Sequence, residues 1–155
     1  MSTRTKVILV TLVVAVPAFL LAKVLFPPPA GPGPSSGQQP WFILLSVLDS
    51  VLLGLGVAFA AFGWTAVRRV SPMSRPRALG IYLSLAWLML SWYPHIELHG
   101  SAFGSTFFGL LVIDYLFHVP LFIAPLVLIW GFAGLLHERT TVASQGTELA
   151  ASEAR

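Results

Sequence analysis

Long apolar runs separated by short polar segments extend through most of the chain. An α-helix needs about 20 largely apolar residues to cross a hydrocarbon core of about 30 Å. The chain contains four runs of sufficient length, at about residues 7–26, 41–67, 78–99 and 106–136. The pattern therefore predicts an all-α fold, an integral membrane four-helix bundle formed by residues 1–137.

The first run has an alternative interpretation as a cleaved signal peptide, with Val16-Pro17-Ala18 as a weak cleavage site. The run continues to Phe26, which is longer than the apolar part of a typical signal peptide. We therefore favour an uncleaved membrane helix.

Two segments outside the apolar runs have a distinctive composition. Residues 27–40 hold six prolines and three glycines without a charge, which predicts an extended, Pro/Gly-rich loop. Residues 138–155 are polar and follow the last run, and we expect them to form a disordered cytoplasmic tail.

The positions of the basic residues predict the orientation. Lys and Arg gather in cytoplasmic loops of membrane proteins. In this chain they precede the first run (Arg4, Lys6) and occupy the connection between the second and third runs (Arg68, Arg69, Arg75, Arg77). The loops at residues 27–40 and 100–105 contain neither. This asymmetry predicts that both termini lie in the cytoplasm, with the plasma (cytoplasmic) membrane as the location.

Composition agrees with a lipid environment and excludes several classes of function. Only 10% of the residues are charged, against about 25% in soluble domains. A net charge of +3 is too small and scattered for nucleic-acid binding. The absence of cysteine excludes disulfides, thiolate metal sites and a cysteine nucleophile. Common hydrolase, phosphate-binding and metalloprotease motifs are missing, which favours a protein that is not an enzyme.

Ionisable residues inside a membrane are costly and commonly mark function. With the predicted topology, two pairs lie in the outer half of the bundle: His95 with His99, and Asp114 with His118. The members of each pair are four residues apart and share a helix face. Imidazole with carboxylate suits Cu, Zn or Fe better than Mg or Ca. We therefore predict one transition metal ion bound by His95, His99, Asp114 and His118, with Asp49 and Glu97 as candidate outer-shell groups.

The start of the last helix decides whether these pairs meet. A start at Ser105 would place Asp114 about 13 Å below the helix end, whereas His95 lies about 6 Å below His99. A start near Gly109 would place Asp114 about 7 Å down, level with His95, and His118 one turn deeper.

Three alternatives remain open at this point. The polar groups of the two pairs can simply satisfy one another or contact interfacial water. A second hypothesis is a non-catalytic accessory or assembly subunit, or a homo-oligomer, that packs through the small-residue face Ser46, Ser50, Gly54 and Ala58. The third is a proton or ion pathway through Asp49, Asp114 and His118.

Overall fold

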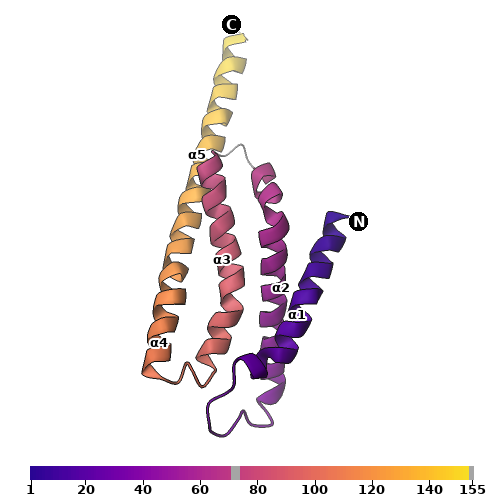
Figure 1. The fold of residues 1–155 in the computed structure, drawn as a ribbon. Coiled ribbons are helices and arrows are strands. Elements are labelled where there is room, and N and C mark those ends of the chain that lie inside the picture. The colour runs from indigo at the N-terminus through magenta and orange to yellow at the C-terminus, as the bar shows by residue number, and fades with distance from the viewer. Residues whose placement is uncertain (71–73, 154–155) are drawn as a thin grey trace.

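The computed structural model describes the backbone of residues 1–70 and 74–153 and the side chains of residues 1–69 and 74–137. In this part of the chain all regular structure is helical (Figure 1). The elements in chain order are α1 (Thr3–Leu25), α2 (Gln39–Val70), α3 (Arg75–His99), α4 (Phe107–Ile113), the π-helical turn η1 (Asp114–His118) and α5 (Val119–Glu153). The segments α4, η1 and α5 follow one another without a break and form one long helical rod.

Three helices are long and apolar enough to cross a membrane: Thr3–Leu25, Gln39–Arg69 and Phe107–His137. The third predicted span, α3, is also long at 25 residues, but its polar residues leave it outside this group. Large apolar side chains cover much of the surface described; Leu20, Phe108 and Phe122 are each at least two-thirds exposed. Such a surface is suited to lipid rather than to water.

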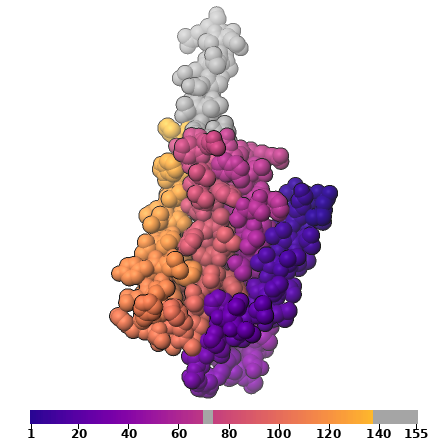
Figure 2. Space-filling view, viewed as in Figure 1, coloured from indigo at the N-terminus to yellow at the C-terminus, as the bar shows by residue number. Residues whose placement is uncertain are grey.

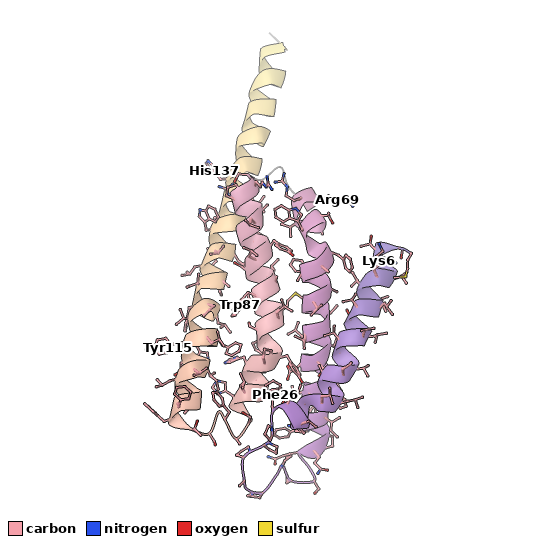
Figure 3. All side chains as sticks on the ribbon, in the orientation of Figure 1. Lys6, Phe26, Arg69, Trp87, Tyr115 and His137 are labelled. Carbon is pink, nitrogen blue, oxygen red and sulfur yellow. The ribbon has the colours of Figure 1, made fainter. Side chains whose placement is uncertain are left out.

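The helices run alternately up and down (Figure 1). Figure 3 shows Lys6, Arg69 and His137 towards the end of the bundle that holds both termini, and Phe26 towards the other end. The Pro/Gly-rich loop and the α3–α4 loop lie at the end opposite the termini. A hydrogen bond from the Ala102 amide to the Pro27 carbonyl, at 2.8 Å, joins these two loops.

Helix α2 lies between α1 and α3, and two glycines permit close contact on both sides. A Cβ at Gly54 would lie 2.4 Å from the Thr11 carbonyl oxygen of α1. A Cβ at Gly56 would lie 3.0 Å from the Met89 Cβ of α3. Small residues at such positions let membrane helices approach closely. The small-residue face of α2 is thus covered at Gly54 by a helix of the same chain, and its use by a partner or second copy stays a prediction.

The apolar core near the end with the termini joins α2, α3 and α5. Its buried members are Val67, Ala78, Ile81 and Leu135. Tyr82 of α3 packs against this group, and its hydroxyl donates a hydrogen bond to the Ala60 carbonyl of α2. These contacts fix α5 beside α3. The candidate site lies between α3 and the same helical rod, towards the end opposite the termini.

The last helical rod begins at Phe107, between the two starts considered from the sequence. The Thr106 side chain caps it by accepting a hydrogen bond from the Gly109 amide at 2.9 Å. A Cβ at Gly109 would lie 1.9 Å from the Phe103 carbonyl oxygen, so this tight entry into α4 requires glycine. The α3–α4 connection is therefore a compact turn between antiparallel helices.

The described backbone of the C-terminal segment differs from the sequence prediction. Residues 138–153, expected to be disordered, continue α5 as a helix to Glu153, while residues 154–155 lie outside the described part of the chain. Extending an existing helix requires less free energy than starting a new one, because each further residue adds a hydrogen bond without the cost of nucleation. Ala, Leu and Glu in this segment also have high helix propensity.

Candidate metal centre

Three of the four histidines come together between the C-terminal end of α3 and η1. One ring nitrogen from each of His95, His99 and His118 lies within 4.8 Å of the others. The Nε2 atoms of His95 and His118 are 2.9 Å apart. His95 and His118 are half-buried, whereas His99 at the end of α3 is exposed. We refer to these three side chains as the histidine cluster.

The carboxylate of Asp114 contacts the histidine cluster through one member only. Asp114 Oδ1 lies 2.7 Å from His118 Nδ1, and Asp114 does not belong to the group of converging nitrogens. A carboxylate accepts hydrogen bonds, so Nδ1 of His118 carries the proton and the lone pair of a neutral ring lies on Nε2. The Nε2 of His95 is then the donor in the contact between the two rings. The result is a hydrogen-bonded chain from His95 through His118 to Asp114.

The ring of His95 is held from two sides. It stacks on Phe117 at 5.4 Å between ring centroids and meets His99 edge-on at 4.9 Å. Its Nδ1 atom is buried and makes no hydrogen bond among the described residues. A buried nitrogen lone pair without a partner is unfavourable. A cluster with a purely structural role would be expected to provide a partner for this nitrogen.

His118 lies in a π-helical turn, which departs from the regular α-helix assumed for the depth estimate. Sequence reasoning placed His118 one turn deeper than His95, on the assumption of a regular α-helix. The Val119 amide instead bonds to the Asp114 carbonyl, five residues back. The turn ends two residues before Pro120, whose missing N–H removes a bond of the α-helical ladder. Single π-turns often occur at functional sites.

The candidate outer-shell groups Asp49 and Glu97 lie elsewhere, on the α1–α2 side of α3. Asp49 accepts a 2.9 Å hydrogen bond from the indole nitrogen of Trp92. Glu97 is 7% exposed and lies 4.0 Å from the ammonium group of Lys23 on α1. The structure therefore brings together His95, His99 and His118, attaches Asp114 to one of them and leaves the other two carboxylates in separate contacts.

The donor set fits a transition metal with small side-chain movements. Zinc–nitrogen bonds of about 2.0–2.1 Å place tetrahedral ligand atoms about 3.4 Å apart. Ligation by both Nε2 atoms would require His95 to lose its Nε2 proton, after which the 2.9 Å contact would open slightly and the widest nitrogen pair, within 4.8 Å, would close. His99 is exposed and can rotate. A carboxylate on the far nitrogen of a ligand imidazole is a common outer-shell arrangement at metal sites.

Comparison with protein-family models, with curated proteins and with solved structures found no match for this chain. The fold places the chain in the class of all-helical proteins, with three helices that are long and apolar enough to cross a membrane.

Proposed function

We propose that the chain is a four-span plasma-membrane protein, with both termini in the cytoplasm, that binds one transition metal ion at the histidine cluster. His95, His99 and His118 are the ligands, and Asp114 orients His118 through its contact with Nδ1. The observation that carries this proposal is the convergence of three imidazole nitrogens within 4.8 Å from two separate elements. In four-span topology the cluster lies in the outer half of the bundle.

The chemistry of the donors narrows the choice of ion. Three neutral imidazoles suit copper, zinc or iron, and the absence of a carboxylate among the converging atoms disfavours magnesium or calcium. Three protein ligands leave a coordination position for water or another molecule, as in zinc sites with an open position. The exposed ring of His99 leaves the cluster accessible from the loop end of the bundle.

The test is metal binding by the detergent-purified full chain. We expect wild type to bind Zn²⁺ or Cu²⁺ in a ratio of one ion per chain, and the His95→Ala and His118→Ala variants to lose that binding. His137→Ala is the matched control, because His137 lies towards the opposite end of the bundle (Figure 3). Equal binding by the wild type and both cluster variants would refute the proposal.

The hydrogen-bonded chain favours one second candidate, a proton-transfer site. The contacts of 2.7 Å and 2.9 Å connect Asp114, His118 and His95 in series. Asp49, which the sequence included in such a pathway, bonds instead to Trp92. A proton-transfer function without metal predicts that reconstituted vesicles acidify in response to an imposed potential. It also predicts that Zn²⁺ leaves this proton flux unchanged, whereas an ion bound at the cluster would block it.

A further inference from the structure

A second candidate site lies on the other side of α3, between the outer ends of α1 and α2. A cavity of about 780 Å³ lies beneath the Pro/Gly-rich loop. Its lining includes Phe19 and Lys23 of α1, Phe42 and Ser46 of α2, and loop residues from Pro28 to Pro34. The volume lies within the range of about 300–1,000 Å³ that is typical of small-molecule sites. We call this space the loop cavity.

An apolar groove continues the loop cavity along the seam between α1 and α2. The groove has a volume of about 240 Å³ and shares Phe19 with the loop cavity. It extends along α1 as far as Leu12 and is lined on α2 by Val47, Ser50 and Val51. The two spaces together form a wide outer chamber with a narrow apolar extension towards the middle of the bundle.

Charge is confined to one position in this combined space. Lys23 is the one charged residue among those that line the loop cavity, and the residues lining the groove carry no charge. The Lys23 side chain is 71% exposed, and its ion pair with Glu97 is long at 4.0 Å. An ammonium group has three donors, so Lys23 can bind a second anion while it contacts Glu97.

The length of the combined space along α1 matches the hydrocarbon thickness of one bilayer leaflet. Eleven residues separate Lys23 from Leu12 in α1, a rise of about 16 Å in a helix. Half of a hydrocarbon core of about 30 Å is about 15 Å. An anionic group at Lys23 therefore lies at one surface of the core, and a chain attached to it would reach the midplane along the groove.

We propose that the loop cavity and groove bind one anionic phospholipid of the outer leaflet. The phosphate contacts Lys23 beneath the Pro/Gly-rich loop, and one acyl chain lies in the α1–α2 groove. The bilayer supplies this occupant directly, because the groove is built from membrane-spanning segments. The site is separate from the histidine cluster and does not depend on its metal.

Native mass spectrometry of the full chain with added phosphatidylglycerol tests the headgroup contact. Lys23→Gln should weaken lipid binding about tenfold, as expected for a lost hydrogen bond to a charged group. Lys23→Arg should retain it, and Lys6→Gln near the other end of α1 is the matched control. Glu97→Gln should strengthen binding, because it removes a negative charge beside the phosphate. A purely structural role of the ion pair predicts weaker binding in both Lys23→Gln and Glu97→Gln, and that result would overturn the proposal.

A second pair of variants tests the position of the acyl chain. Val16 lines the groove and is 52% exposed, whereas Leu9 is 51% exposed on the same helix and does not line it. Val16→Trp should displace the lipid, and Leu9→Trp should not. Equal binding by these two variants would overturn the assignment of the groove. Equal binding of oleate and phosphatidylglycerol, with the same dependence on Lys23, would identify the occupant as a fatty acid and overturn the phospholipid.

Discussion

Asp114 determines which nitrogen of His118 faces the other two imidazoles. Its carboxylate lies 2.7 Å from Nδ1 of His118, which leaves Nε2 directed at His95. The sequence placed Asp114 among the ligands because a residue four positions from His118 shares its helix face. Spacing alone does not distinguish a carboxylate that binds an ion from one that binds the ligand ring. That distinction depends on the side-chain conformation in the folded protein.

Asp114→Asn should weaken metal binding without removing it. An amide is a weaker acceptor than a carboxylate and no longer favours the required tautomer of His118. Loss of such outer-shell partners typically costs about 10- to 100-fold in metal affinity. Competition titration against a chelator measures this change. An effect as large as that of His118→Ala would instead identify Asp114 as a ligand.

Metal affinity should fall as the solution is acidified. Ligand imidazoles must be neutral, so protons compete with the ion, and free imidazole side chains titrate at about pH 6.5. We expect tight binding at pH 8 and progressive release of the ion below about pH 6.5. Titrations in weakly buffered solution should also detect protons released on binding. Affinity that is constant between these two pH values would contradict ligation by histidine.

At the scale of elements, the π-helical turn η1 carries His118, whose ring contacts His95 of α3. The long apolar run at residues 106–136 predicted the last helical rod, and the two starts considered from the sequence bracket its first residue, Phe107. The π-turn was not predicted, because one wider turn leaves the average spacing of apolar residues almost unchanged. Pro120 was the available signal in the sequence.

Pro120→Ala should convert η1 towards a regular α-helix. The new N–H restores a bond in the helical ladder, and the shift in register moves His118 away from His95. We expect much weaker metal binding with unchanged total helix content, measured by titration and circular dichroism. Pro125→Ala, in the interior of α5, is the matched control and should leave the affinity unchanged.

The contact between α1 and α2 should be sensitive to a side chain at Gly54. Gly54→Leu would force these helices apart, because even a Cβ meets the Thr11 carbonyl at 2.4 Å. Overpacking of this kind costs about 1–3 kcal/mol. Thermal unfolding in detergent should show a lower midpoint, whereas Ala61→Leu on the exposed side of α2 should not. Metal affinity should persist in both variants, because the histidine cluster lies between α3 and η1.

At the scale of the whole molecule, Figure 2 shows α1 at one edge and the α4–α5 rod at the other, with α2 and α3 between them. The apolar runs in the sequence predicted this set of helices. They did not predict that Lys23 and Glu97 would pair, because that contact depends on how α1 lies against α3. Sequence periodicity assigns a residue to a helix face, but the neighbour of that face is decided by packing of the complete bundle.

The proposed topology can be tested by labelling single cysteines, because the natural chain has none. Ser36, Ser74 and Ser105 are exposed positions outside the helices. In intact cells, a membrane-impermeant maleimide should label Ser36→Cys and Ser105→Cys. It should label Ser74→Cys only after permeabilisation. Labelling of all three positions in intact cells would contradict four spans with internal termini.

The polar composition of α3 has a consequence for how the protein enters the membrane. The translocon releases a helix into lipid according to its apparent insertion free energy, and charged residues oppose release. α3 carries the paired Glu97 and two members of the histidine cluster, and it is not among the three helices apolar enough to span by themselves. In the proposed four-span topology, its insertion should therefore wait until the α4–α5 rod is present to shield these groups. On this basis α3 completes the bundle during biosynthesis, although it precedes the rod in the chain.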